Sequence, residues 1–118
     1  MDRRFLDNWA TQLRKGLLDL CVINAVARRR MYGYDIVRML RRIEGLVISE
    51  GTIYPLLSRL TRDGLVRSAL AESSEGPARK YYELTALGRR VLQRMNASWA
   101  IIAQGVNAIQ AQEAGDAQ

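Results

Sequence analysis

The sequence predicts a mainly α-helical fold with a small β component, of the α+β type. Apolar residues recur at helical spacing in four segments, and two strand-like runs flank a turn of polar, Gly and Pro residues. The order is helix, helix, helix, strand, turn, strand, helix, which is the plan of a winged helix-turn-helix with a two-stranded wing and a long C-terminal helix. The 118 residues suffice for one modest core, so a leftover apolar stripe would indicate a partner subunit.

The first two helices follow from apolar periodicity. Apolar residues four apart open the chain, at Phe5, Trp9, Leu13 and Leu17. The almost wholly apolar run "LLDLCVINAVA" continues them, which predicts a helix over about 4–28 with a wide buried face. A second helix is predicted from the spacing of Ile36, Met39, Leu40 and Ile43, with Gly45 as its stop.

The segment "EGTIYPLLSRLTRDGLV", residues 50–66, predicts a third helix. Ser49 is a good N-cap, and Ile48 before it can pack on Ile53. One narrow face is apolar, formed by Ile53, Leu56, Leu57 and Leu60. Gly64 suits the left-handed position after the helix, with Leu65 folding back onto Leu60. Pro55 lies near the start and on the outward side, so we expect the helix to tolerate it.

Two strands and a last helix complete the chain. The runs "LVRSALAE" and "RKYYEL" are strand-like, and "SSEGPA" between them reads as the turn. Tyr81 and Tyr82 alternate along the second strand, so one of them should face the core. Thr85 is expected to start the final helix, over about 86–112.

Composition excludes several kinds of chemistry. The chain has no histidine and one cysteine, Cys21, which lies in an apolar run. We therefore expect no internal disulfide and no metal site, whether of Cys and His or of other ligands. Glu72 and Glu75 flank the turn without a nucleophile or phosphate loop, which indicates no enzyme, no catalytic residue and no cofactor. No run approaches signal-peptide or membrane-span length, so we expect a cytoplasmic protein without a membrane partner.

Charge and the outward face of the third helix point to DNA. Residues 1–94 hold all 18 Lys and Arg against 10 of the 12 acidic residues, a net charge of +8, which favours a polyanionic partner. Opposite the apolar face lie Gly51, Tyr54, Pro55, Ser58 and Arg62, flanked by Thr52 and Arg59. Hydroxyls and guanidinium groups suit phosphates and base edges in a major groove, although an ordinary solvated face has similar residues. Arg79 and Lys80, where the second strand leaves the turn, would grip phosphates or reach the minor groove.

Three segments resemble the PadR family of bacterial transcriptional regulators. They are "YGYDI", "SEGTIYPLLSRLTRDGLV" and "GPARKYYELTALGRRVL", and the similarity runs from about Leu13 to Leu92. The resemblance implies a homodimeric repressor with an effector-responsive dimer interface. Within the family, the chain is similar to the short class, in which the C-terminal part is a single helix.

The final helix has a heptad seam with nothing in its own chain to cover it. Residues spaced 4, 3, 4 and 3 form it, at Met95, Trp99, Ile102, Val106 and Ile109. Pairing with a partner's helix and with the Phe5, Trp9 and Leu13 face would bury it, and the dimer would present two recognition helices to a pseudo-palindromic operator in double-stranded DNA. We therefore expect residues 1–84 to form the DNA-binding domain, and residues 85–118 a dimerisation helix with a polar tail.

Trp99 is the candidate effector residue, with Met95 and Trp9 beside it. Two Trp99 indoles facing each other in a dimer would make a mostly apolar slot for a planar aromatic molecule. Multidrug-binding members of the PadR family have a tryptophan in a similar "SW" dipeptide, here Ser98-Trp99. The alternative is that both tryptophans only pack. For the whole chain, the alternatives are a winged-helix protein–protein interaction module and a nucleoid-type binder without sequence preference.

Overall fold

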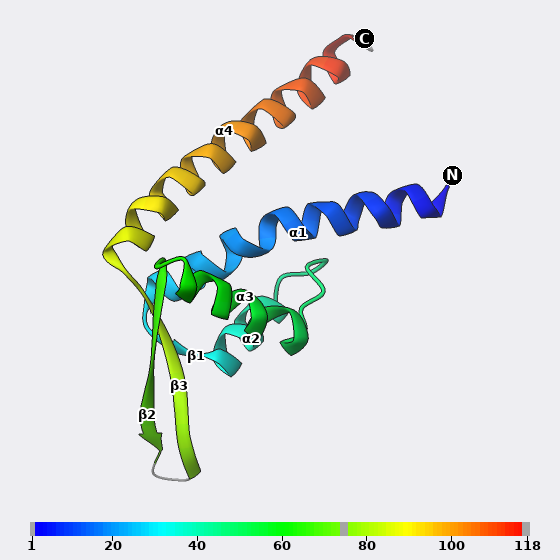
Figure 1. Ribbon diagram of the computed structural model, residues 1–118. Helices are drawn as coiled ribbons and strands as arrows, with labels where there is room; N and C mark the ends of the chain where they lie inside the picture. The colour runs from blue at the N-terminus through cyan, green and yellow to red at the C-terminus, as the bar shows by residue number, and fades with distance from the viewer. Residues whose placement is uncertain (1, 74–75, 117–118) are drawn as a thin grey trace.

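The computed structural model describes residues 2–73 and 76–116, and over them the chain forms a winged helix-turn-helix with two long helices (Figure 1). The elements are α1 (Arg3–Arg28), β1 (Met31–Tyr32), α2 (Gly33–Arg41), α3 (Glu50–Arg62), β2 (Val66–Ser73), β3 (Gly76–Leu84) and α4 (Ala86–Asp116). The predicted fold class is therefore confirmed.

The core lies where the second half of α1, α2 and α3 meet the base of the sheet. Its most deeply buried side chains are Val22, Ile23, Val26, Ile36, Val37, Ile53, Leu57 and Val66. The strands run in the order β1-β3-β2, all antiparallel, with Met31 and Ser68 both opposite Tyr82. Tyr82 is buried and Tyr81 only partly so, which confirms the alternation expected for these two residues.

Helix α3 ends as the sequence predicts. Gly64 has a φ of +78°, a left-handed conformation that favours glycine. The Leu65 amide donates to the Leu60 carbonyl and the Gly64 amide to the Thr61 carbonyl, both at 3.1 Å, which is a Schellman ending. Pro55 lies inside the helix on its exposed side. The helix continues through it, as expected, although the proline has no N–H to donate.

Two predicted details of helix ends are wrong. The second helix stops at Arg41, four residues before Gly45, because the Arg42 and Ile43 amides bond to carbonyls only three residues back and tighten the last turn. Ile43 consequently lies outside the helix and is exposed. Ser49 occupies the N-cap position of α3, but its hydroxyl contacts that of Thr52 at 3.0 Å and caps no backbone amide.

The wing also differs from the prediction. β1, which was not predicted, pairs with β3 through Met31 and Tyr32 and makes the sheet three-stranded at its base. The range 76–78 belongs to β3 and not to the turn, while residues 74–75 lie outside the described residues. A proline is tolerated at position 77 because β1 pairs only with Tyr81 and Tyr82. At Pro77, β3 therefore has a neighbouring strand on one side only, and the missing N–H can face the open side.

A short junction joins α3, both wing strands and α4. The Thr85 hydroxyl donates to the carbonyls of Gly64 and Leu65, at 2.6 and 3.1 Å, and accepts from the Gly88 amide at 2.9 Å. Thr85 therefore caps α4, and the helix starts where the sequence predicts. Gly88 packs so closely that a Cβ there would lie 2.1 Å from the Leu65 carbonyl oxygen. This junction fixes the direction in which α4 leaves the wing.

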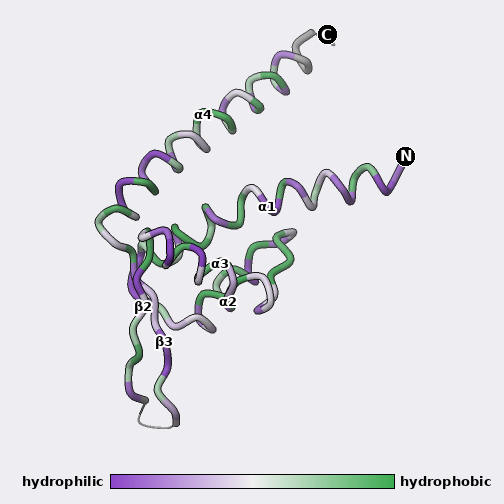
Figure 2. Tube along the Cα trace, in the orientation of Figure 1, coloured by the Kyte–Doolittle hydropathy of each residue, from purple (hydrophilic) through white to green (hydrophobic). Residues whose placement is uncertain are grey.

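Helices α1 and α4 diverge toward the two termini and project beyond the core (Figure 1). The radius of gyration is 17.6 Å, against roughly 13–14 Å expected for a compact chain of this length. Hydrophobic residues continue along both projecting arms (Figure 2). The exposed apolar side chains there are Phe5, Leu6, Trp9, Leu13, Trp99, Ile101, Ile102, Val106 and Ile109.

The junction predicts opposite effects for two glycines of α4. Gly88→Ala should destabilise the protein by about 2–3 kcal/mol, because its methyl group would overlap the Leu65 carbonyl. Gly105→Ala is the matched control: nothing lies within 4 Å of its added Cβ, so alanine should stabilise the helix by about 0.5–1 kcal/mol. Urea unfolding followed by circular dichroism measures both. Equal changes in the free energy of unfolding would show that the backbone around Gly88 can move to accommodate a methyl group without loss of stability.

Candidate nucleic-acid interface

The outward face of α3 is polar and open. Gly51, Thr52, Tyr54, Ser58 and Arg62 are all exposed, while the opposite face of the helix is buried in the core. The structure thus brings the predicted helix residues onto one side of a rigid, well-terminated helix. Glu50 in the first turn suits the helix dipole and is the one acidic side chain at this end of α3.

Tyr54 links α3 to the start of α2. A Cβ on Gly33 would lie 2.5 Å from Cε1 of the Tyr54 ring, so the ring sits directly on the glycine backbone. Partial burial and the nearby Glu50 carboxylate raise the pKa of the Tyr54 hydroxyl. The hydroxyl therefore stays protonated and can donate a hydrogen bond from a fixed position. Gly33 was missed from the sequence, although it lies in the "YGYDI" motif.

Arg59 is held away from the rest of the face. Its Nη2 donates to both carboxylate oxygens of Asp19 on α1, each at 2.9 Å. This ion pair ties α3 to α1 and neutralises the guanidinium group. Asp19 carried no signal in the sequence, because 40 residues separate the two partners. Arg62 forms no such pair among the residues that the structure describes.

The two predicted wing residues lie on opposite faces of β3. Lys80 is exposed opposite Leu70 on the face that holds Tyr82. Arg79 is also exposed as a residue, but its guanidinium carbon stands 4.0 Å from the centre of the Tyr32 ring. Tyr32 was not singled out from the sequence, although it opens the "YGYDI" motif, because its partner depends on the unpredicted strand β1.

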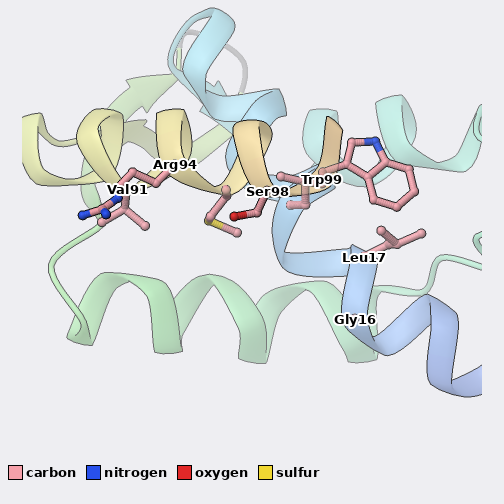
Figure 3. A pocket seen from close by; sticks show the side chains of 8 residues that line it. Gly16, Leu17, Val91, Arg94, Ser98 and Trp99 are labelled. Carbon is pink, nitrogen blue, oxygen red and sulfur yellow. The ribbon is translucent and has the colours of Figure 1, made fainter. Parts of the chain in front are cut away.

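The candidate effector residues are only partly brought together. Met95 and Trp99 line a cavity of about 410 Å³ between α1 and α4. The Trp99 indole extends from α4 above Leu17 of α1, with Ser98 and Arg94 toward the wing end (Figure 3). Trp9 is not among the lining residues and lies eight positions before Leu17, on the exposed part of α1. Burial raises the pKa of the nearby Cys21 thiol, which keeps it protonated.

Two kinds of site are not found in the described part of the chain. Within residues 2–73 and 76–116, no three His, Cys, Asp or Glu side chains gather in a way that could hold a metal ion. In the same ranges, no helix combines the length and apolarity that crossing a membrane requires.

A winged helix-turn-helix with an exposed polar recognition helix and a basic wing defines a DNA-binding regulator. The profile of the transcriptional regulator PadR-like family matches residues 22–94, which is more than half of the chain. The chain belongs to the PadR-like family, as its sequence motifs predict, and this is a family of transcriptional regulators and not of enzymes.

Individual relatives agree with this assignment. The chain is 30% identical over 105 residues to a transcriptional regulator from Mycobacterium tuberculosis, covering 89% of this chain and 96% of that protein. A PadR-like transcriptional regulator from Bacillus cereus is 36% identical, with a TM-score of 0.76 over 83% of this chain and 95% of that chain. A PadR family regulator from Eggerthella lenta is 33% identical, with a TM-score of 0.77 over 90% and 92% of the two chains.

The two arginines of α3 should differ in their effect on DNA binding. Arg62→Gln should weaken binding to a labelled duplex by about 1 kcal/mol or more, because its guanidinium is available to a phosphate. Arg59→Gln should cost less, since that guanidinium already binds Asp19. Asp19→Asn should strengthen binding by releasing Arg59. Fluorescence anisotropy at constant salt measures all three, and a larger loss for Arg59→Gln would mean that it leaves Asp19 to contact DNA.

Proposed function

We propose that this regulator is a homodimeric repressor whose release from a pseudo-palindromic operator is controlled by a planar aromatic effector. It acts in the cytoplasm on double-stranded DNA, without catalytic activity and without a cofactor. Residues 1–84 bind DNA, and residues 85–118 dimerise. The observation that carries the proposal is the pair of unpartnered apolar arms beside an exposed recognition helix.

The recognition helix α3 and the wing are the proposed DNA contacts. Gly51 allows close approach of the backbone, and Tyr54 and Ser58 offer hydroxyls to base edges or phosphates. Arg62 and Lys80 offer free positive charge. Arg59 is the weakest member of the predicted set, since its charge is paired. Thr52 offers a hydroxyl at the start of α3, and Arg79 offers a guanidinium group from β3.

The apolar arms support dimerisation. Trp99, Ile102 and Ile109 are 43%, 61% and 67% exposed, although they form a regular heptad seam. The Phe5, Trp9 and Leu13 face of α1 is exposed as well. Contiguous apolar surface of this extent is unusual on a monomer, and a second copy of the same seam covers it with matching shape. Ile101, next to the seam residue Ile102 and also exposed, widens this apolar surface.

The cavity beside Trp99 supports an aromatic effector. It is lined mainly by aliphatic and aromatic side chains from α1 and α4, and Arg94 provides its one charged lining residue. An apolar slot with one guanidinium group favours a flat molecule that has an anionic group, and disfavours a cation. Phenolic acids have this chemistry, whereas cationic dyes do not. Trp9 contributes through the dimer interface in this proposal, not through the cavity.

A second cavity offers a route from the effector slot to the DNA-binding helices. It has about 360 Å³, shares Leu20 and Trp99 with the first, and extends to Met39 and Leu40 of α2. Asn24 of α1 and Asn96 of α4 exchange two side-chain hydrogen bonds of 3.0 Å at its wall. A shift of Trp99 therefore acts on both the α1–α4 contact and α2. The ligand changes DNA affinity only by its differential affinity for the two states.

Salt titration and genomic selection separate this proposal from its alternatives. Purified protein is incubated with fragments of the source genome, and the bound fragments are sequenced. A repressor enriches a few pseudo-palindromic sites, whereas a nucleoid-type binder enriches none. A protein–protein interaction module shows neither enrichment nor the steep loss of affinity with salt that counterion release produces.

Dimerisation should depend on the seam of α4. Ile102→Glu combined with Ile109→Glu should give monomers at micromolar concentration, because unpaired charges would enter an apolar interface. Gln104→Glu combined with Ala111→Glu is the control, since it adds the same charge at two exposed positions on the opposite side of the heptad. Analytical ultracentrifugation measures the mass of each. A wild-type protein that is monomeric and folded would contradict the dimer.

Effector binding should quench Trp99 and require Arg94. Titration with a hydroxycinnamic acid should give saturable quenching that survives Trp9→Phe and disappears in Trp99→Ala. Arg94→Gln, or the amide of the same acid, should bind at least about ten-fold more weakly, since a charged hydrogen bond is lost. Saturating ligand should release the operator. If a panel of aromatic acids and dyes changes neither fluorescence nor operator binding, Trp99 only packs.

A further inference from the structure

Four side chains form a continuous stack on β1 and β3. Tyr32 and Tyr81 are direct cross-strand partners, with ring centres 6.4 Å apart in an edge-to-face arrangement. The guanidinium carbon of Arg30 lies 4.5 Å from the centre of the Tyr81 ring, and that of Arg79 lies 4.0 Å from the centre of the Tyr32 ring. The ring of Tyr81 on β3 is thus covered by an arginine that precedes β1, and the ring of Tyr32 on β1 by an arginine of β3. We name these four residues the Arg–Tyr stack.

The Arg–Tyr stack lies on the face of the sheet that does not pack on the core. Side chains alternate along a strand, and Met31 and Tyr82, the paired neighbours of the stacked tyrosines, are buried on the other face. Burial of apolar residues therefore does not explain the stack. Two cation–π pairs here hold two long, flexible arginine side chains in fixed positions at the surface.

The stacked arginines differ from the paired ones. Over the residues that the structure describes, Arg59 and Arg67 bond to carboxylates, at 2.9 and 2.8 Å, whereas the guanidinium groups of Arg30 and Arg79 have no ion-pair partner. Asp35 lines a cavity with Arg30 but forms no ion pair with it. Stacking uses the flat face of a guanidinium group and leaves its edge N–H donors available, which is the arrangement that suits a phosphate.

The Arg–Tyr stack adjoins the recognition helix. Tyr32 directly precedes Gly33, and the Tyr54 ring of α3 rests on that glycine. The charge of Arg79 also acts on the Tyr54 hydroxyl and lowers its pKa, against the raising effect of burial. A duplex with its major groove on Tyr54 would therefore have a phosphate backbone close to Tyr32 and Arg79.

We infer that Arg30 and Arg79 bind DNA backbone phosphates as a pair, and that Tyr81 and Tyr32 are positioning residues that hold the two guanidinium groups. This inference rests on the proposed DNA-binding function and adds Arg30, from the loop after α1, to the surface formed by α3 and the wing. β1 has the role of setting the register of the pair, since it places Tyr32 opposite Tyr81.

The first experiment measures the salt dependence of binding to a labelled duplex of mixed sequence. Removing one phosphate contact should lower the slope of log affinity against log salt by about 0.9. We expect this for Arg30→Gln and for Arg79→Gln, and about twice as much for the double variant. Arg67→Gln is the matched control: it removes the same charge from the same sheet face, but from an arginine paired with Glu83.

The second experiment tests positioning without changing charge. Tyr81→Leu removes the ring under Arg30 and should lower the salt slope nearly as much as Arg30→Gln. Tyr81→Phe keeps the ring and should restore the wild-type slope. Arg30→Lys keeps the charge but not the flat group that stacks, and should fall between the two. Thermal melting verifies that each variant is folded, and because Arg30 is exposed, its variants remain informative if Tyr81→Leu unfolds.

The outcomes are distinct. If wild-type protein binds the duplex with a steep salt dependence but Arg30→Gln matches Arg67→Gln, the inference is wrong and the DNA-binding function stands. If Tyr81→Leu keeps the wild-type slope, the tyrosines do not position the arginines. If wild-type protein binds duplex DNA without salt dependence, both the inference and the proposed function fail.

Discussion

The close contact between Gly88 and the Leu65 carbonyl is the constraint on which the arrangement of the domain depends. At this point the end of α3, the base of both wing strands and the start of α4 come within one hydrogen-bonded junction, closed by the Thr85 hydroxyl. Only a residue without a side chain allows α4 to approach so closely. The recognition helix, the wing and the long helix are therefore held as one rigid unit, and their relative orientation does not depend on flexible connections.

The sequence predicted those parts of the fold that depend on interactions between residues close together in the chain. The Schellman end at Gly64, the Thr85 cap and the heptad seam of α4 follow from residues a few positions apart, so spacing in the sequence was enough. β1 could not be predicted in this way: two residues are too few for a periodic signal, and their strand conformation exists only because β3 lies beside them. The early end of α2 comes from hydrogen bonds between residues three apart, which tighten the last turn before Gly45. The spacing of apolar residues gives no sign of these bonds.

The same distinction applies to the candidate site. The exposed face of α3 could be predicted, because a helix with one buried face must present the other. The states of the arginines on α3 and the wing could not. Arg59 of α3 is paired with a carboxylate 40 residues away, and Arg79 of β3 is stacked on a ring 47 positions earlier in the chain. Basic residues that look equivalent in the sequence thus divide into paired, stacked and free groups, and this division decides which of them have donors to offer to DNA.

The rigid junction at Gly88 gives the long C-terminal helix a mechanical role. With 31 residues, α4 is roughly 46 Å long, so a rotation of about 5° at its base moves its far end by roughly 4 Å. In the dimer that we propose, the same coupling would act in the opposite direction: a small shift at the contact between the two α4 helices would turn each winged unit as a whole. Recognition helices must lie about 34 Å apart to enter successive major grooves on one side of a duplex. A shift of a few ångströms where the two α4 helices meet would therefore be enough to change the distance between the recognition helices, so that they no longer fit successive grooves.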